Sequence, residues 1–175
     1  VGIETVAGCT GDECPGTWNE EVQKTISSVI GENNYDIGHL FGASGGGGDA
    51  GCIGCVCDPL ENTNSTPVYS IGKGSAYTSP SDSRPVGDSF DIDFVAHEMG
   101  HQIGATHTFS FTIEGSGTSV EPGSGSTIMG YAGITSQDAA KHSIDKYHAA
   151  TIEQIQANLA TKSCPITTNI SSDNA

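Results

Sequence analysis

The chain has 175 residues, which suits one domain with a hydrophobic core of its own. Its formal net charge is −15 and it carries only 6 Lys and Arg residues, a balance that argues against nucleic acid and anionic membrane surfaces as partners. No apolar run reaches the length that spans a bilayer, so we expect no membrane insertion.

The 6 cysteines, an even number, fit an oxidising compartment. Cys9 and Cys14 bracket a short turn and can pair locally, and we expect Cys164 to tie the last helix to the cysteine cluster at residues 52–57. A zinc knuckle is the alternative for this cluster, but it needs a fourth ligand nearby and none is present. The spacing does not define the connectivity. Since no signal peptide is visible at Val1, we expect a processed, mature secreted form.

The first half of the chain is predicted to contain one helix and two strands. Residues 18–30 carry apolar side chains at helical spacing and stop at Gly31, which predicts an amphipathic helix. Residues 35–41 alternate as a strand, and residues 74–78 offer a second, shorter one. No helix with Lys-Ser or Lys-Thr follows the glycine run at 45–48, so we expect a loop there rather than a phosphate-binding cradle.

The most informative stretch lies in the middle of the chain and reads H-E-x-x-H-x-x-G-x-x-H. At about 100° per helical residue, His97 and His101 lie about 40° apart, so both imidazoles can bind one zinc ion. A continued helix would carry His107 to the wrong side, whereas Gly104 can adopt positive φ and end the helix. We expect His107 to be the third ligand, which leaves a fourth position for water and marks a catalytic zinc. Glu98 is then the general base for that water.

A core helix that carries these histidines by accident is the alternative interpretation, but the full pattern rarely recurs by chance. Asp91 or Asp93 can cap the N-terminus of the helix. Together with Asp88 they also suggest Ca²⁺, but their spacing matches no calcium-loop motif and capping explains them adequately. One catalytic Zn²⁺ is therefore the cofactor we expect, and Ca²⁺ stays a minor alternative.

A second motif follows in the run Ser-Thr-Ile-Met-Gly-Tyr, which contains Met129. The two motifs together resemble metzincin zinc endopeptidases, which carry a methionine turn beneath the metal. The resemblance implies an α/β (α+β) fold in one catalytic domain, residues 1–175, with a cleft between two subdomains. Residues 1–107 would supply a twisted mixed sheet and the active-site helix. Residues 108–175 would form a small, mostly irregular subdomain that ends in a helix at 147–159.

The resemblance also assigns roles around the metal. Met129 would form a hydrophobic floor under the ligands. Tyr131 would ligate zinc or swing to stabilise the oxyanion, with a buried structural tyrosine as the alternative. The strand before the active-site helix would be the sheet edge that pairs with substrate, or else an ordinary edge strand, and the segment after Tyr131 would form the wall of the S1′ pocket. The residues concerned are Gly74, Ser75, Ala76 and Tyr77 in the strand and Ala132, Gly133 and Ile134 in the wall.

Within the metzincins, the runs at 91–102 and 125–133 look most like bacterial reprolysin-like (M12B-type) peptidases. Two positions depart from the adamalysins. Thr108 stands where adamalysins have aspartate, and Tyr131 stands where they have proline. Pappalysins share with this chain both the threonine and the tyrosine at these two positions.

The expected function is a secreted zinc endopeptidase that acts on proteins or peptides. Two alternatives stay open: a zinc-bearing binding module that has lost turnover, and a zinc amidohydrolase of small molecules. Retention of Glu98 argues against the first, and an open cleft with an edge strand argues against the second.

Metzincin N-terminal subdomains usually open with a strand, a helix and another strand before the segment that residues 35–41 resemble. The 34 residues ahead of that segment hold one convincing helix, so this opening unit is expected to be absent from the chain. Inner strands without neighbours would leave main-chain groups unpaired. We therefore hypothesise that the chain is either a trimmed portion of a longer catalytic domain or the larger piece of a nicked one. An N-terminal fragment or pro-peptide of the same precursor would then be a further partner that stays bound by completing the sheet.

Overall fold

The computed structural model describes residues 17–62, 70–80, 82–115 and 117–166, and the predicted Cys9–Cys14 pair and the segment ahead of residue 17 lie outside them. The described chain forms a small α+β domain. Its elements in order are α1 (Thr17–Val29), η2 (Glu32–Asn34), β1 (His39–Phe41), β2 (Gly48–Asp49), β3 (Glu61–Asn62), β4 (Ser70–Ile71), β5 (Ala76–Thr78), α2 (Asp88–Phe90), η3 (Asp91–Ala96), α3 (His97–Gln102) and α4 (Ala149–Leu159).

β5 is the central strand of a three-stranded mixed sheet with the order β1-β5-β2. β1 runs parallel to β5, with His39 opposite Ala76, and β2 runs antiparallel, with Gly48 opposite Thr78. The edge position predicted for residues 74–77 does not hold for Tyr77, which pairs with β1 on one side and with β2 on the other, while Gly74 and Ser75 precede β5. Among the described strands, β1 and β2 lie at the two edges of this sheet, and β2 lies in a segment that we expected to be a loop. β3 and β4 form a separate antiparallel pair.

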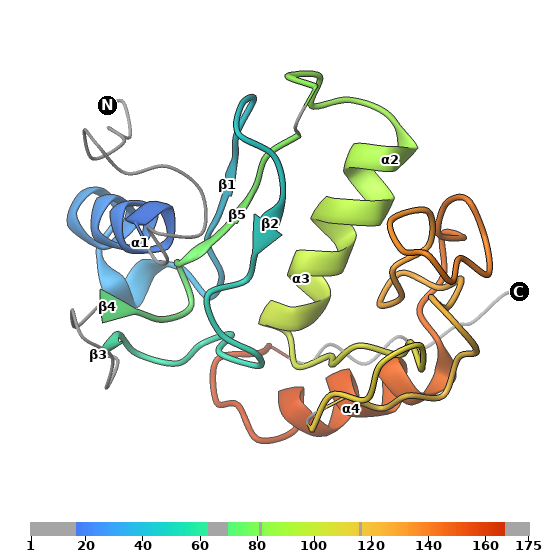
Figure 1. The fold of residues 1–175 in the computed structure, drawn as a ribbon. Helices are drawn as coiled ribbons and strands as arrows, with labels where there is room; N and C mark the ends of the chain where they lie inside the picture. The colour runs from blue at the N-terminus through green and yellow to red at the C-terminus, as the bar shows by residue number, and fades with distance from the viewer. Residues whose placement is uncertain (1–16, 63–69, 81, 116, 167–175) are drawn as a thin grey trace, which may run out of the picture.

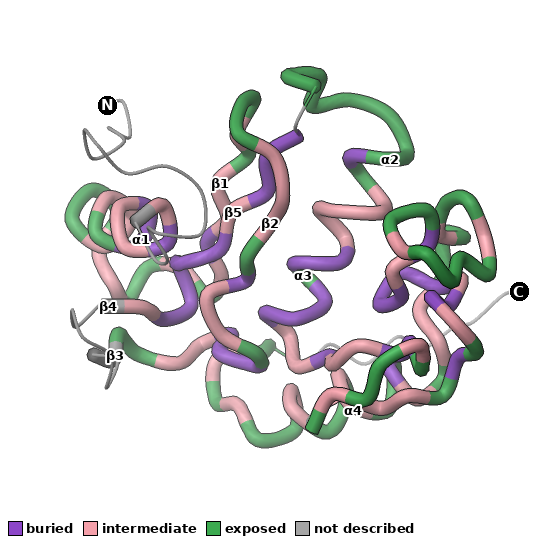
Figure 2. Tube along the Cα trace, viewed as in Figure 1, coloured by how far each residue is buried: buried purple, intermediate pink, exposed green. Residues whose placement is uncertain are grey.

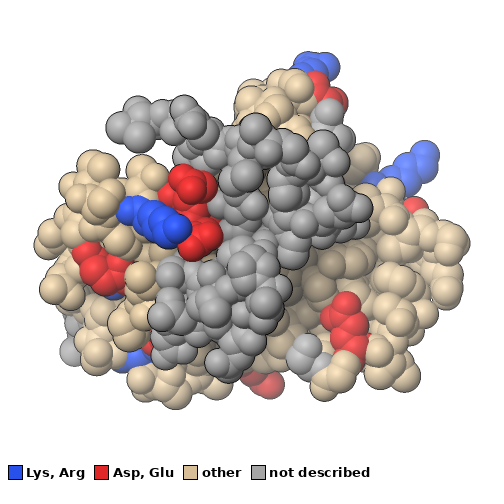
Figure 3. All heavy atoms as spheres, turned by 60° about the vertical axis from the view of Figure 1, so that its left-hand side comes forward, with Lys and Arg blue, Asp and Glu red and all other residues tan. Residues whose placement is uncertain are grey.

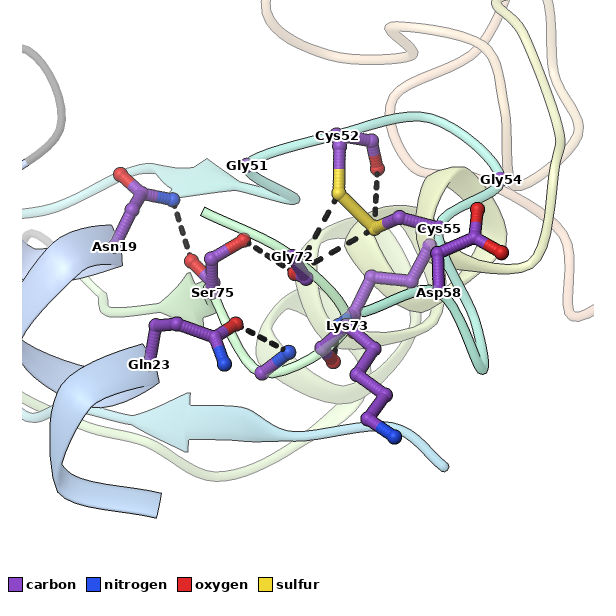
Figure 4. The surroundings of a disulfide bond; sticks show 12 residues. Asn19, Gln23, Gly51, Cys52, Gly54, Cys55, Asp58, Gly72, Lys73 and Ser75 are labelled. Carbon is purple, nitrogen blue, oxygen red and sulfur yellow. Dashed lines mark hydrogen bonds between the residues drawn. A yellow bond between two sulfur atoms is a disulfide. The ribbon is translucent and has the colours of Figure 1, made fainter. Parts of the chain in front are cut away.

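The predicted amphipathic helix is confirmed as α1, which covers one face of the sheet (Figure 1). Trp18 packs edge-on against Tyr77, with 5.2 Å between the ring centroids. Figure 4 shows two polar side chains of α1 that reach the strand region. Asn19 donates to the carbonyl of Ser75 at 2.6 Å, and the side-chain oxygen of Gln23 accepts from a main-chain N–H at 2.8 Å. These bonds satisfy main-chain groups that lie next to β5.

α2, η3 and α3 follow one another as a helical segment on the opposite face of the sheet (Figure 1), and η3 is wound as a π-helix. The predicted capping by Asp91 or Asp93 is wrong. The helical segment begins at Asp88 after Gly87 and has no side-chain cap, while Asp93 accepts a hydrogen bond from the main-chain N–H of Ser143 at 2.9 Å.

A buried polar chain joins this helical segment to the sheet. Gln102 in α3 is fully buried and donates to the carbonyl of Gly38 at 2.9 Å. Its side-chain oxygen lies 2.8 Å from Nδ1 of His39, whose Nε2 lies 2.8 Å from the hydroxyl of Thr78. Both ring nitrogens of His39 are thus engaged in hydrogen bonds within the protein.

The described part of the chain after residue 107 is mostly irregular and ends in α4, close to the helix predicted at 147–159. A disulfide between Cys57 and Cys164 ties the end of α4 to the cysteine cluster, as expected, and Cys52 pairs with Cys55 (Figure 4). These two bonds use the whole cluster, so the disulfide interpretation holds and the zinc knuckle does not.

Buried residues gather along β5 and α3 (Figure 2). On the face shown in Figure 3, the described Lys and Arg side chains form no continuous basic patch, in keeping with the net charge of −15. Within the described residues, no helix is long and apolar enough to cross a membrane.

Candidate active site

The end of α3 determines where the third histidine lies. Gly104 has φ of 116°, a left-handed conformation that favours glycine. Its N–H donates to the carbonyl of His101 at 3.0 Å, and the N–H of Ala105 donates to that of Gly100 at 2.9 Å. This pair of bonds is the Schellman arrangement, which ends a helix and reverses the chain. His107 is thereby returned to the face of α3 that carries the first two histidines, as the motif predicted.

The three histidines converge through their Nε2 atoms. Nε2 of His101 lies 3.2 Å from that of His97 and 3.1 Å from that of His107. Nitrogen ligands at 2.0–2.1 Å from a tetrahedral zinc ion lie about 3.4 Å from one another. The spacing of the three nitrogens therefore fits one zinc ion.

The opposite ring nitrogens show which tautomer each histidine adopts. Nδ1 of His97 lies 2.7 Å from the carbonyl of Ile128, and Nδ1 of His101 lies 2.8 Å from that of Ala105. A carbonyl can only accept, so both Nδ1 atoms carry the proton. Nδ1 of His107 donates to the carboxylate of Glu114 at 2.7 Å. Three Nε2 lone pairs then face one another, an arrangement that a cation stabilises.

Burial keeps two of these rings unprotonated. It lowers the pKa of His97 to about 3, with the neighbouring His101 as a further cause. Burial likewise lowers the pKa of His101 to about 4. Since zinc binds neutral imidazole, both rings are ready to bind metal at neutral pH without losing a proton.

Glu98 is 8% exposed and lies against the edge strand. A Cβ placed on Gly48 would come within 2.6 Å of Cγ and Oε1 of Glu98, so only glycine leaves room for the carboxylate there. Burial raises the pKa of Glu98 to about 8, and the negative charge of the nearby Asp49 contributes to the increase. A hydrogen bond from the main chain of Ala50 acts in the opposite direction. A zinc ion beside it would also favour the ionised form.

Met129 and Tyr131 lie next to the histidines. Met129 is fully buried, and a Cβ on Gly100 would lie 2.5 Å from its sulfur, which places the methionine against the helix turn between the first two ligands. The ring of Tyr131 lies 5.6 Å from that of His97 and 4.7 Å from that of His107, measured between centroids. Burial raises the pKa of Tyr131 to about 12, so its hydroxyl keeps its proton.

Two cavities share His97, Glu98 and Tyr131 in their walls. The first has a volume of about 320 Å³ and lies between the histidines and residues 48–53, which include β2. The second has a volume of about 280 Å³ and is lined by the expected residues Ala132, Gly133 and Ile134.

Gly74, Ser75, Ala76 and Tyr77 line neither cavity, because β2 lies between β5 and the site. Several residues that do line the first cavity were missed from sequence, and two of them, Gly48 and Glu114, contact the predicted base or a predicted ligand. Gly48 belongs to a run that we interpreted as a loop, and Glu114 follows the third histidine at a spacing that no motif defines.

Calcium gains no support from the described residues. The acidic residues Asp88, Asp91 and Asp93 do not converge on a common point there. Besides the three histidines, one further described group comes close enough to hold an ion, formed by Asp36, Cys57 and Cys164, but its two cysteines are joined in a disulfide.

A helix that carries His97, Glu98 and His101, a glycine turn that returns His107, and a sheet edge beside them define a zincin-type metallopeptidase. The comparison with protein families agrees. The model of metallo-peptidase family M12B, reprolysin-like, matches residues 6–159, and the chain belongs to this family of zinc endopeptidases. No curated protein and no solved structure gave a significant match.

Proposed function

We propose that the chain is a secreted endopeptidase that cleaves peptide bonds in extended protein segments bound along β2. One observation carries the proposal. A buried carboxylate, Glu98, lies beside three converging imidazole nitrogens, between two cavities and directly under a sheet edge. The two disulfides among the described residues support an oxidising, extracellular location.

His97, His101 and His107 would hold a zinc ion, which would supply a Lewis acid for the scissile carbonyl and for an attacking water. Glu98 accepts the proton of the attacking water and passes it to the leaving amine. The contact with Gly48 and the hydrogen bond from Ala50 fix the position of this carboxylate. Exclusion of water around it keeps its proton affinity high enough for both transfers.

Tyr131 is the candidate donor to the developing oxyanion. Its ring lies against those of His97, His107 and Phe109, with 4.6 Å between its centroid and that of Phe109. A phenol with its pKa raised to about 12 stays protonated at neutral pH and can donate a hydrogen bond. Ligation of zinc by the same oxygen is the other role that the position allows.

The substrate main chain is proposed to pair with the outer edge of β2, which no other described strand covers, because an edge strand offers N–H and C=O groups to an extended peptide. The two cavities on either side of Glu98 then receive side chains from both sides of the scissile bond. This favours cleavage within a chain. Residues 132–134 supply the wall of the second cavity, the S1′ side, and Met129 the floor beneath the ligands.

The proposal is tested by removing and restoring zinc while the cleavage of a protein substrate is followed. Removing zinc with a chelator should abolish cleavage of denatured casein, and adding zinc back in equimolar amount should restore it. Product termini located by mass spectrometry should lie inside the casein chains. Zinc-dependent peptide binding without cleavage would instead support a binding module. Hydrolysis of small N-acyl amides with intact casein would support an amidohydrolase.

A further inference from the structure

Glu121 is a buried carboxylate whose environment the proposed chemistry does not explain. It is 6% exposed, and among the described residues no Lys, Arg or His pairs with it. Its Oε1 accepts hydrogen bonds from the main-chain N–H groups of Ser126, at 2.9 Å, and Thr127, at 3.1 Å, and from the hydroxyl of Ser126 at 3.3 Å. Its Oε2 accepts from the hydroxyls of Thr108 and Thr127.

One of these donors belongs to the segment of the third histidine. Thr108 directly follows His107 and is fully buried. Its carbonyl accepts from the N–H of Glu121 at 2.8 Å, and its own N–H donates to the carbonyl of Met129 at 3.1 Å. The residue beside His107 is therefore fixed through both its main chain and its side chain.

The other donors belong to the segment that orients the imidazole of the first histidine, His97, through a hydrogen bond. Ser126 and Thr127 immediately precede Ile128, whose carbonyl accepts from Nδ1 of His97 at 2.7 Å. A single carboxylate thus joins the chain next to His107 to the chain that orients His97.

The hydrogen bonds keep this carboxylate charged. Burial alone would raise the pKa of Glu121, but the bonds from Thr108, Thr127 and the N–H of Ser126 outweigh it and leave the pKa below its ordinary value. A buried charge without a cation is tolerated only where such bonds compensate for lost hydration. An apolar residue would fill the same space without that cost, so filling space alone does not explain the choice of glutamate.

We propose that Glu121 is a positioning residue of the zinc site, whose carboxylate fixes the segment of His107 against the segment of Ile128 and so sets how the His107 and His97 imidazoles converge. The inference rests on the proposed zinc site. Its consequence is measurable in metal affinity, before any substrate is present.

The test compares Glu121→Gln and Thr108→Val with the parent protein by competition for zinc against a chromogenic chelator. Glu121→Gln keeps the shape but loses the charge and one accepting oxygen, and we expect its zinc Kd to rise by about 10–100-fold, the usual range for residues that support metal ligands. Thr108→Val removes one donor and should raise the Kd by a smaller factor. Glu153→Gln, on the exposed side of α4, is the matched control and should leave the Kd unchanged.

The thermal unfolding of each metal-free variant separates positioning from packing. If both variants bind zinc as tightly as the parent and only unfold at lower temperature, Glu121 is structural and the inference fails. If Glu121→Gln does not fold, the zinc Kd and the thermal unfolding of Thr108→Val decide in its place. A parent protein that binds no zinc would overturn the proposed function itself, and this inference with it.

Discussion

Tyr131 occupies a position in which a catalytic and a structural role both fit its contacts. Its ring packs on Phe109, which is buried, and it faces His107. Its side chain also lines both cavities beside Glu98. Packing alone would not require a hydroxyl, so the phenolic oxygen is the atom to remove.

Tyr131→Phe should lower kcat by about 10²-fold while KM changes little, because a bond to the oxyanion forms mainly in the transition state. Steady-state kinetics on a peptide substrate measure both constants, and thermal unfolding of the same samples controls for folding. A variant that unfolds at lower temperature but keeps the parent kcat would show that this tyrosine is structural.

The two buried histidines give the metal-free protein a defined pH dependence. In the unfolded chain an imidazole takes up a proton below about pH 6.5, whereas in the folded protein burial lowers the pKa of His97 to about 3 and that of His101 to about 4. Below pH 6.5 the unfolded state therefore binds more protons. Each ring then lowers the free energy of unfolding by up to about 1.4 kcal/mol per pH unit of acidification.

Glu98 acts in the opposite direction between its unfolded pKa of 4.5 and its folded pKa of about 8, but one carboxyl does not cancel two imidazoles. We expect urea unfolding in the presence of chelator to show lower stability at pH 4.5 than at pH 6.5. His97→Asn should flatten this dependence, and His142→Asn, whose side chain is 71% exposed, should not. If the free energy of unfolding of His97→Asn changed with pH as steeply as that of the parent, this explanation would be wrong.

At the scale of elements, the site depends on how closely β2 approaches α3. Gly48 on β2 faces Glu98 on α3, and no Cβ fits between them without displacing the carboxylate. Gly48→Ala should therefore lower kcat with the fold retained, because the base moves away from its position. Gly115→Ala, in open space, is the matched control. Peptide cleavage by the two variants measures the effect, and an unchanged kcat for Gly48→Ala would show that β2 does not constrain the base.

The elements with strong local patterns were predictable from sequence. Apolar periodicity gave α1 and α4, and the histidine spacing with Gly104 gave the ligand set, because both patterns express helix geometry. β2 was not predictable, because Gly48 and Asp49 are poor strand formers and pair only through the tertiary structure. That unrecognised edge strand is also why β5 was placed at the edge.

The residues that support the ligands could not be predicted, because their contacts have no fixed spacing. Glu114 reaches His107 through an irregular loop, and Glu121 reaches Thr108 and Thr127 at sequence separations of 13 and 6. A buried carboxylate can be recognised only when its surroundings are known.

At the scale of the whole molecule, α4 braces the loop that carries the third histidine. Gln154 accepts from the N–H of Thr106 at 3.1 Å, and Asn158 donates to the carbonyls of Ile103 and Gly54 at 3.0 and 3.2 Å. Just beyond α4, a disulfide joins two segments that lie far apart in the sequence. An ion pair with 2.6 Å between its nitrogen and oxygen atoms lies beside it. The residues concerned are Cys57 with Cys164 in the disulfide and Asp58 with Lys162 in the ion pair.

Replacing Cys57 and Cys164 together by alanine should lower the free energy of unfolding by about 2–5 kcal/mol, because the bond closes a long loop. Its sequence separation is 107, against 3 for Cys52–Cys55. The double alanine variant of Cys52 and Cys55 is the control and should lose less. Chemical denaturation measures both, and an equal or greater loss in the control would argue against this bracing role.

The central claim is that Glu98 activates water beside zinc held by His97, His101 and His107. Glu98→Gln tests it most directly, because glutamine keeps the shape but cannot take up the proton. The account predicts that the variant binds one zinc per chain, as the parent does, while its rate of casein cleavage falls by about 10²–10⁴-fold. Glu153→Gln, exposed on α4, should cleave at the parent rate. Near-normal cleavage by zinc-loaded Glu98→Gln would contradict the account.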